Sequence, residues 1–408
     1  MMDRSTPSKG KVSIMFRISG TGCSLVDHIY ARIDYSSERM RPYWSRTPGD
    51  GGLEPGKLVF TEDFEQFAGI DCLQAIADMT QGKAADAINI GGPPVVAMIN
   101  AAQILDPTRF SFRFVGTLGE DEMAGELLRI LQETPISSDY FLGKPALTPF
   151  TYVLSDPGHD NGRGERTFLN NIGSAGLLTP DDLDADFFEA EMVVFGGTAL
   201  VPRIHDALDV LLAKAKTRCA FTVVSTIYDF RNQRLRPDAR WPLGGSDEAY
   251  GKTDLLISDR EEALRLSGSA NIDDALAFFI RQGVGAAVVT NGARDIALAV
   301  GSDQFVPPGR KRFPVCRAID LELKEHPERK GDTTGCGDNF VGGILVSLAS
   351  QLEGGSRIIN LEEAIAWGAA CGGFACFQMG GVFRESRRGE KKTLLEPYVE
   401  AYRRGENA

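Results

Sequence analysis

The sequence is poor in histidine and lacks any closely spaced pair of cysteines. Its four histidines do not have the spacing of a zinc motif, and its seven cysteines contain no CxxC pair. A zinc site is therefore not expected. An odd number of widely scattered cysteines is typical of free thiols in a reducing compartment, so we expect a cytoplasmic protein.

Excess positive charge and long apolar runs are also absent. The formal net charge is -12, so no global basic field attracts a nucleic acid backbone. The polar start of the chain and the short apolar run that Arg17 interrupts predict neither a signal peptide nor a membrane span. We expect no nucleic acid or membrane as a partner. An anionic ligand would instead need glycine-rich backbone, a helix N-terminus or a divalent cation.

Short apolar runs alternate with amphipathic segments over most of the chain. Nearly continuous apolar runs of strand length are typical of strands that are buried on both faces. Such runs lie at residues 11–19, 112–119, 192–197, 220–226, 254–259 and 286–291. Apolar residues three and four apart predict helices at 121–133, 202–217 and 272–283. This alternation predicts a doubly wound α/β fold, in which a mostly parallel sheet is flanked by helices and ligands bind beyond the carboxyl ends of the strands.

Two regions, at about 30–60 and 138–172, break the alternation. Both are rich in glycine, proline, aromatic and charged residues, and the second has a hairpin-like pattern around Thr151 and the turn Asp156-Pro157-Gly158. We expect these insertions to form a small β lid, with ordinary surface loops as the alternative. The expected division of the chain is a disordered tail at 1–10, a main domain at 11–385 that carries the lid, and a helical C-terminal tail at 386–408.

The most informative stretch is KGDTTGCGDNFVGGILVSLASQ, residues 330–351. Its second half has the apolar pattern of a helix, which places Gly335, Cys336 and Gly337 at the helix N-terminus. Unpaired backbone amides and the partial positive charge there predict an anion hole for a phosphoryl group. Asp338 beside it suits a base that takes the proton from a substrate hydroxyl. A first-turn carboxylate that only offsets the helix dipole is the alternative.

The string from Asp332 to Asp338, followed by Phe340 and Gly343, resembles the C-terminal signature of the PfkB, or ribokinase-like, family of carbohydrate and nucleoside kinases. The likeness extends from about residue 11 to about residue 380. It implies an ATP-dependent carbohydrate kinase that phosphorylates a hydroxyl of a small sugar-like, polyhydroxy substrate, with ATP and Mg²⁺ as cofactors. It also makes a monovalent cation near the anion hole a candidate cofactor and a homodimer through the lid a candidate assembly.

Further segments follow the order of that family and imply roles for their residues. By resemblance, the substrate-binding residues are Asp27, Gly91, Gly92 and Arg166, the nucleotide-binding residues are Thr290, Gly292 and Thr333, and the magnesium ligands are Asp259 and Glu262. The residues alone also allow plainer interpretations. Asp27 could be a loop or cap residue, Asp259 could begin a helix as its N-cap, and Arg166 could pair with Glu165 on the surface.

Three residues depart from the family pattern. Val96 and Asp259 stand where the family has asparagine, and Asp295 stands where it has glycine. These departures favour one alternative, a catalytically silent module that binds a sugar or a nucleotide. The long stretch between Asp27 and Gly91 favours a second alternative, a nucleoside (adenosine-like) kinase.

Two other nucleotide-binding motifs are excluded. The string GGLEPGK at 51–57 is not a P-loop, because Leu58 occupies the place of the serine or threonine that binds Mg²⁺. The string GTGCSL at 20–25 is not a dinucleotide fingerprint, because Leu25 replaces the third glycine. A P-loop enzyme and a nicotinamide oxidoreductase are therefore not expected.

Overall fold

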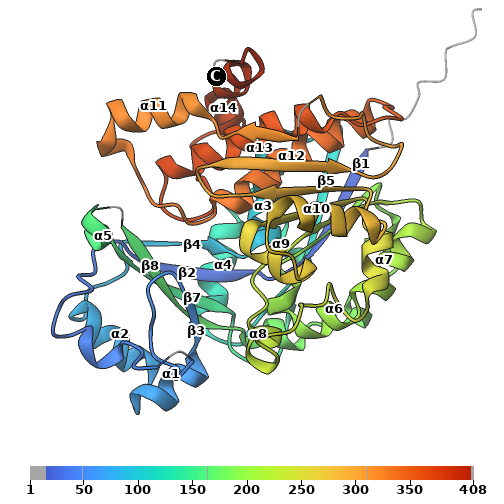
Figure 1. The fold of residues 1–408 in the computed structure, drawn as a ribbon. Helices are drawn as coiled ribbons and strands as arrows, with labels where there is room; N and C mark the ends of the chain where they lie inside the picture. The colour runs from blue at the N-terminus through green and yellow to red at the C-terminus, as the bar shows by residue number, and fades with distance from the viewer. Residues whose placement is uncertain (1–14, 48, 163, 310, 406–408) are drawn as a thin grey trace, which may run out of the picture.

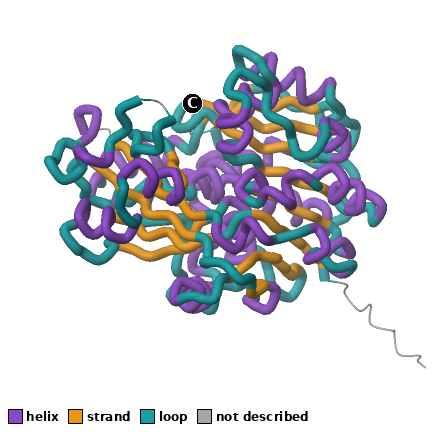
Figure 2. Tube along the Cα trace, turned by 90° about the horizontal axis from the view of Figure 1, so that it is seen from below, coloured by secondary structure: helices purple, strands orange, loops and turns teal. Residues whose placement is uncertain are grey.

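The structure, a computed structural model, describes residues 15–47, 49–162, 164–309 and 311–405. The tail expected at 1–10 lies outside the described residues. The described residues form two β-sheets with helices around them (Figure 1), and Figure 2 shows the strands of the two sheets as separate groups.

The larger sheet is mostly parallel, as predicted. Its strand order is β14-β13-β12-β11-β10-β9-β1-β5-β6, and only the two pairings of β13 are antiparallel. The strand bounds are Phe16–Gly22 (β1), Phe110–Leu118 (β5), Phe141–Gly143 (β6), Met192–Gly196 (β9), Phe221–Ser225 (β10), Leu255–Asp259 (β11), Ala286–Thr290 (β12), Asp295–Val300 (β13) and Arg312–Pro314 (β14). The six apolar runs of the sequence overlap β1, β5, β9, β10, β11 and β12.

Both faces of the larger sheet are covered by helices, which explains the continuous apolar runs. In β9, Met192 and Val194 belong to one hydrophobic core, while Val193 and Phe195 belong to a second core on the other face. The first core includes α3 (Pro93–Ile104), α12 (Cys336–Glu353), α13 (Leu361–Phe374) and α14 (Glu390–Arg403). The second includes α6 (Pro202–Asp206), α7 (Leu208–Thr217), α9 (Arg260–Ser267) and α10 (Ile272–Arg281). The predicted doubly wound α/β class is therefore confirmed.

The smaller sheet forms a lid over one end of the larger sheet. Its order is β3-β8-β7-β2-β4, with bounds Leu25–Tyr30 (β2), Leu58–Phe60 (β3), Ala87–Gly91 (β4), Phe150–Asp156 (β7) and Glu165–Asn171 (β8). The hairpin expected near Asp156 is present, because β7 and β8 pair antiparallel from Phe150 opposite Asn171 to Asp156 opposite Glu165. The segments 30–60 and 138–172 supply β3, β7 and β8, and β2 and β4 complete the sheet.

Five further α-helices of the described residues surround these sheets, together with a short one in the lid turn. They are α1 (Thr61–Ala68), α2 (Cys72–Thr80), α4 (Glu122–Leu131), α8 (Phe230–Leu235) and α11 (Arg317–Glu325), and the short helix is α5 (His159–Gly162). The C-terminal α14 packs into the first core through Leu395, Val399 and Tyr402. No helix among the described residues is long and apolar enough to cross a membrane.

Candidate active site

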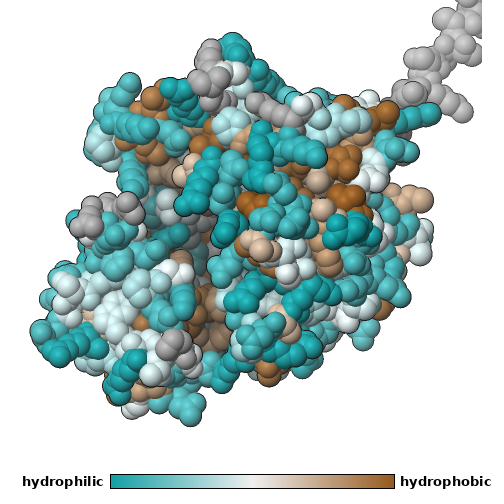
Figure 3. All heavy atoms as spheres, viewed as in Figure 1, coloured by the Kyte–Doolittle hydropathy of each residue, from teal (hydrophilic) through white to brown (hydrophobic). Residues whose placement is uncertain are grey.

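A cavity of about 1130 Å³ separates the lid from the carboxyl ends of the parallel strands. Figure 3 shows the surface hollowed between the lid and the rest of the molecule. The lid contributes residues such as Asp27 and Asn170, and the main sheet contributes the segment after β10 and the ends of β11 and β12. The cavity therefore lies where the fold class predicts a ligand site.

The start of α12 forms one wall of this cavity. Gly335 is the N-cap residue with φ 80° and ψ 5°, a left-handed conformation that favours glycine, and a Cβ there would collide with the backbone of Gly381. The amides of Gly337 and Asp338 have no backbone partner among the described residues, and the Cys336 amide makes only a long hydrogen bond of 3.4 Å to the Thr333 carbonyl before the helix. Gly335 and Gly337 line the cavity, whereas the Cys336 side chain does not. The predicted anion hole thus begins a helix and opens onto a cleft.

Asp338 faces the cavity from the first turn of α12. Its carboxylate has no hydrogen-bond partner among the described residues, and burial raises its pKa to about 6. At neutral pH the group is therefore mostly ionised, with lone pairs free to accept a proton. A carboxylate that served only to offset a helix dipole would not need to face a cavity of this size.

Asp27 lies across the cavity, on the lid strand β2. It is 5% exposed and has no hydrogen-bond partner among the described residues. Burial and the nearby carboxylates of Asp338 and Asp332 raise its pKa well above the usual value, and Arg166 opposes the shift. A Cβ at Gly91 would collide with this carboxylate, so the glycine leaves room for it. A buried carboxylate without a protein partner is suited to accept hydrogen bonds from ligand hydroxyls.

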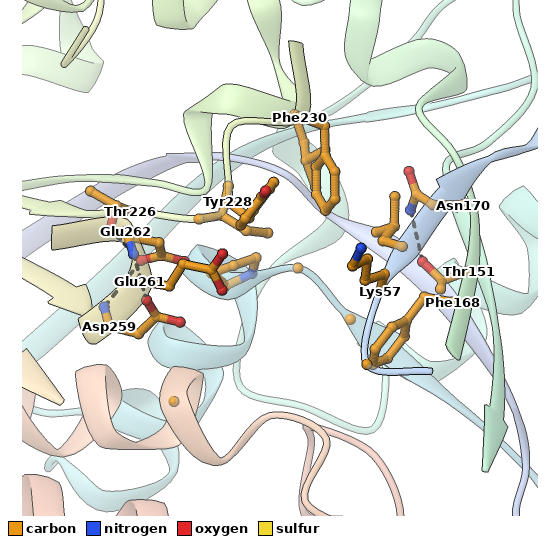
Figure 4. Close-up of a pocket in the computed structure, with 18 of the residues that line it drawn as sticks. Lys57, Thr151, Phe168, Asn170, Thr226, Tyr228, Phe230, Asp259, Glu261 and Glu262 are labelled. Carbon is orange, nitrogen blue, oxygen red and sulfur yellow. Dashed lines mark hydrogen bonds between the residues drawn. The ribbon is translucent and has the colours of Figure 1, made fainter. Parts of the chain in front are cut away.

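Three other buried polar atoms of the cavity wall lack a partner among the described residues. They are Asn170 Oδ1, Ser225 Oγ and Ser258 Oγ. The Asn170 amide nitrogen donates to Thr151 Oγ1 at 2.8 Å across the lid hairpin, which fixes its side chain (Figure 4). Because unsatisfied buried polar atoms are costly, these three atoms mark places where a polar ligand is expected to bind.

Asp259 and Glu262 form the capping box at the start of α9. Asp259 Oδ1 accepts from the Glu262 amide at 2.8 Å, and Glu262 Oε2 accepts from the Asp259 amide at 3.1 Å and from Thr226 Oγ1 at 2.5 Å (Figure 4). Both carboxyl groups nevertheless line the cavity. Burial, followed by repulsion from Asp259, raises the pKa of Glu262 to about 8. A cation bound between them would relieve that repulsion, so the residues fit an Mg²⁺ site.

The expected nucleotide-binding residues are only partly brought together. Thr290 lines the cavity beside Asp259, its partner in the pairing of β11 with β12. Gly292 has φ 57° in the following turn, and Thr333 is an exposed residue before α12. Neither Gly292 nor Thr333 lines the cavity.

Arg166 connects the lid to the loop before α12. One of its guanidinium nitrogens donates to Thr334 Oγ1 at 2.9 Å, and its guanidinium carbon lies 5.4 Å from the centre of the Phe168 ring. Arg166 itself does not line the cavity, although both of these neighbours do. Burial raises the pKa of both Asp27 and Asp332, and the charge of Arg166 opposes that rise at each.

The departures from the family pattern have structural explanations. Val96 is fully buried and packs against Gly381 behind the anion hole. Asn100 is buried beside α12, with its amide 3.4 Å from the Asn339 carbonyl, and does not line the cavity. Asp295 accepts hydrogen bonds from Asn291 and Arg312. None of these arrangements removes a group from the wall around Asp338.

Sequence reasoning did not find two residues behind the anion hole. Lys391 of α14 is 1% exposed, and its Nζ donates to Asn339 Oδ1 at 2.9 Å. The Asn339 amide in turn donates to the carbonyls of Gly335 at 2.9 Å and Gly381 at 2.7 Å. Burial lowers the pKa of Lys391 to about 8. Asn339 directly follows the motif, but nothing in the sequence near Lys391 indicates that it reaches this site.

Sequence reasoning also missed contacts that join the lid to the main body at the cavity mouth. Arg234 of α8 donates to both carboxylate oxygens of Asp63 in α1, at 2.8 and 2.6 Å. The rings of Phe60 and Phe230 lie 5.6 Å apart between the same two segments. Lys57, the last residue of the rejected P-loop-like string, lines the cavity with its Nζ 2.5 Å from Glu54.

Comparisons with known proteins agree with this geometry. The model of the pfkB family carbohydrate kinases matches residues 88–386. The chain is 26% identical over 283 residues to a probable fructokinase-5 of Arabidopsis thaliana, a match that covers 66% of this chain and 78% of that protein.

Solved structures show the fold. An adenosine kinase from Sinorhizobium meliloti superposes with a TM-score of 0.63 at 19% identity, covering 94% of this chain and 99% of that one. A putative ribokinase II from E. coli in complex with ATP and Mg²⁺ gives a TM-score of 0.61 at 17% identity, covering 95% and 99%. These matches establish a ribokinase-like fold.

Proposed function

As a member of the pfkB family of carbohydrate kinases, the chain is an ATP-dependent phosphotransferase acting on a sugar hydroxyl, and we propose that Asp338 is its catalytic base. The observation that carries this proposal is the position of Asp338. Its unpartnered carboxylate shares one cavity with the amides that begin α12 and, across the cleft, with Asp27. A hydroxyl held between the two carboxylates would face a phosphoryl group held by the helix start.

The division of labour in the cavity follows from the charges. Amides at Gly335, Cys336 and Gly337 supply fixed partial positive charge for the transferred phosphoryl group. Asp27 and the backbone of Gly91 and Gly92 hold the substrate hydroxyls, and Asp338 accepts the proton of the reacting one. Positioning and charge stabilisation account for most catalysis in phosphoryl transfer.

The nucleotide and its metal ion belong on the side of β11 and β12. Asp259 and Glu262 would hold Mg²⁺, which when bound offsets the charge of the ATP phosphates. The structural neighbour from E. coli was solved with both ATP and Mg²⁺. Thr290 borders the same part of the cavity, and we propose that Gly292 and Thr333 approach the nucleotide once it is bound.

We propose that a monovalent cation binds beside the anion hole. Asp332 Oδ2 and Gln378 Oε1 are buried oxygens without a partner among the described residues. Asp332 Oδ1 accepts from the amides of Thr334 at 2.8 Å and Gly380 at 3.4 Å, which orders this loop. Two unsatisfied oxygens are suitable ligands for a potassium ion. If the site is used, replacing potassium by choline in an ADP-release assay should lower the rate. An unchanged rate would show that the site is not used.

The substrate we favour is a neutral sugar such as fructose. The cations at the cavity mouth, Lys57 and Arg234, are each paired with a carboxylate. Neither Asp27 nor Asp338 forms an ion pair with a cation among the described residues. The carboxylate of Asp338, which is mostly ionised at neutral pH and has no cationic partner, disfavours a sugar acid or a sugar phosphate. The fructokinase relative agrees with this choice.

A nucleoside is the second candidate because aromatic side chains line the same cavity. Tyr228 and Phe230 lie 4.6 Å apart between ring centres, and Phe60 borders Phe230. Such faces suit a flat base. The adenosine kinase neighbour makes adenosine the compound to test.

The decisive experiment is an ADP-release assay with ribose, fructose, 2-keto-3-deoxygluconate, adenosine and inosine. We expect turnover with a sugar, and we expect the Asp338→Asn variant to lower kcat at least about 100-fold, the size of a general-base contribution. Asp181→Asn, an exposed carboxylate outside the cavity, is the matched control. If no compound in the panel consumed ATP, the silent binding module would be the better description.

We also propose that the protein is located in the cytoplasm. None of the seven cysteines forms a disulfide in the structure, which suits a reducing compartment such as the cytoplasm. A homodimer through the lid is the candidate assembly from the sequence.

A further inference from the structure

Two cysteines lie side by side at the anion hole. The sulfur of Cys336, the first residue of α12, lies 3.5 Å from the sulfur of Cys376, which follows α13 in the short helix Ala375–Phe377. Both side chains are partly exposed. Of the other five cysteines, four are buried, and Cys219 is exposed at the far end of the larger sheet.

Backbone contacts hold the two cysteine-bearing segments together. The Gly331 amide donates to the Cys376 carbonyl at 2.8 Å, and the Asp332 amide donates to the Gln378 carbonyl at 3.0 Å. A Cβ at Gly335 would collide with Gly381, so the helix start is packed directly against the second segment. The short distance between the sulfurs therefore results from two fixed segments rather than from two free side chains.

We propose that Cys336 and Cys376 form a reversible disulfide under hydrogen peroxide, and that this modification switches off the kinase. A disulfide has a sulfur–sulfur distance of about 2 Å, so the two sulfurs need to approach by about 1.5 Å. Rotation of side chains and a small shift of the helix start can supply that movement.

The chemistry balances with hydrogen peroxide as the two-electron oxidant. The Cys376 thiolate attacks one peroxide oxygen, the O–O bond breaks, hydroxide leaves, and Cys376 becomes a sulfenic acid. The Cys336 sulfur then attacks the Cys376 sulfur. The S–S bond forms, the S–O bond breaks, and the departing hydroxide takes the Cys336 proton as water.

The arrangement favours Cys376 as the sulfur that reacts first. The two sulfurs share one hydrogen bond at 3.5 Å in which either could donate. With the Cys336 thiol as the donor, this bond lowers the pKa of Cys376, while the same bond and burial raise the pKa of Cys336. Thiolates are the reactive form of cysteine. Cys376, with the lower pKa, is therefore the sulfur that attacks the peroxide, and Cys336 is the sulfur that then attacks the sulfenic acid.

The bond would act on the anion hole because Cys336 supplies one of its amides. Drawing Cys336 towards Cys376 moves the first turn of α12 relative to the bound phosphoryl group. A misplacement of about 1 Å in a catalytic site costs on the order of 100-fold in rate. We expect kcat to fall at least tenfold on oxidation and to recover with dithiothreitol.

Peptide mass spectrometry of the peroxide-treated full chain tests the bond directly. Trypsin cleaves after Lys330, Arg357 and Arg384, which places Cys336 in peptide 331–357 and Cys376 in peptide 358–384. The expected product is these two peptides joined, two mass units below their sum. Because 358–384 also contains Cys371, fragmentation between Cys371 and Cys376 assigns the bond. A sulfenic or sulfinic acid on Cys376 without the joined peptides would overturn the proposal.

Activity measurements with cysteine variants test the consequence. Cys376→Ala should retain the activity of the reduced protein and lose its sensitivity to peroxide. Cys371→Ala and Cys219→Ser, the matched controls, should remain as sensitive as the unchanged chain. A bond that forms without a change in kcat, or sensitivity that persists in Cys376→Ala, would refute the switch. Because the bond is detected by mass, this result is independent of whether the residues proposed for catalysis are correct.

Discussion

Asp338 combines two properties that oppose each other, a half-buried position and the need to be ionised. Burial raises its pKa to about 6, which makes it a stronger base than an exposed aspartate while leaving it mostly ionised at neutral pH. A pKa near the working pH is the compromise expected for a general base.

The pH dependence of catalysis follows from this shift. Because only the ionised carboxylate accepts a proton, kcat/KM should be constant above about pH 7 and should fall roughly tenfold per pH unit below about pH 6. The measurement is a pH series of kcat/KM for the best substrate with ATP and Mg²⁺ saturating. An apparent pKa near 4, as for an exposed aspartate, would contradict the proposed burial of the base.

Lys391 is predicted to position the anion hole without touching the substrate. Its hydrogen bond to Asn339 orients the amide that binds the carbonyls of Gly335 and Gly381. Lys391→Met keeps most of the volume but removes that bond, and we expect kcat to fall about tenfold, within the range for a misplaced site. The matched control is Lys392→Met at the neighbouring, exposed position.

The pH profile separates positioning from a purely structural effect. Since Asp338 stays in place, Lys391→Met should keep the apparent pKa near 6 while lowering the plateau of kcat. A variant that lost thermal stability but kept the normal kcat would show that Lys391 matters only for folding.

Among the elements, the strands of the main sheet were predicted more closely than the helix expected at 202–217. Buried parallel strands have apolar residues on both faces, and the run at 192–197 therefore marks β9 almost to the residue. The helix expected at 202–217 is divided at Ala207 into α6 and α7, with His205 turned inwards to Thr198 at 2.9 Å. A periodic apolar pattern does not reveal such a break, since both pieces keep the same buried face.

The candidate site was predictable where it is continuous in sequence. Residues 335–338 form one turn, so their helix start and their chemistry could be inferred together. Lys391 and Asn339 meet only because α14 packs against α13 and α3, which brings together two residues 52 positions apart. The pair of Cys336 and Cys376 depends on the same kind of long-range packing. One sequence without coordinates contains no local signal for these contacts.

The link between α1 and α8 is predicted to hold the lid closed over the substrate. Arg234 and Asp63 connect the main body to the lid at its outer edge. The Arg234 side chain is 72% exposed, so the pair is worth no more than about 1 kcal/mol. We expect Arg234→Gln to raise the KM for the sugar about twofold to fivefold while leaving kcat nearly unchanged.

Arg231 on the same helix provides the matched control. It pairs with Asp206 inside the main body, so Arg231→Gln should leave the KM for the sugar unchanged. The double variant Asp63→Arg with Arg234→Asp should restore a low KM, because it rebuilds the pair with reversed charges. If Arg234→Gln and Arg231→Gln changed the KM for the sugar equally, this would argue against a role of Arg234 in lid closure.

At the scale of the whole molecule, the outer face of the lid is already covered. Apolar side chains on that face, Tyr152, Leu154 and Leu169, are buried in the same core as Phe64 of α1 and Met79 of α2. The insertion between β2 and β4 therefore covers the outer face of the lid sheet. A second subunit is not needed to bury that face.

The edges of the lid sheet offer little more to a partner. On one side, β3 has only three residues. On the other side, residues 379–384 of the same chain are hydrogen-bonded to β4. The Asn89 side chain donates to the carbonyls of Met379 and Val382, and Arg384 donates to the Ile88 carbonyl. A stable interface needs about 800 Å² from each partner, and a three-residue edge strand or an edge already bonded to its own chain is a poor basis for one.

We therefore predict that the protein is a monomer, in contrast to the lid dimer that the sequence made a candidate. Sedimentation equilibrium at micromolar concentrations should give the mass of one chain, with and without substrate and ATP. Activity per chain should also be independent of protein concentration, since every proposed site residue comes from one chain. A dimer mass would contradict this prediction. Tyr152→Glu disrupts the lid's outer face, so a dimer mass that this substitution left unchanged would show that the chain assembles through another surface.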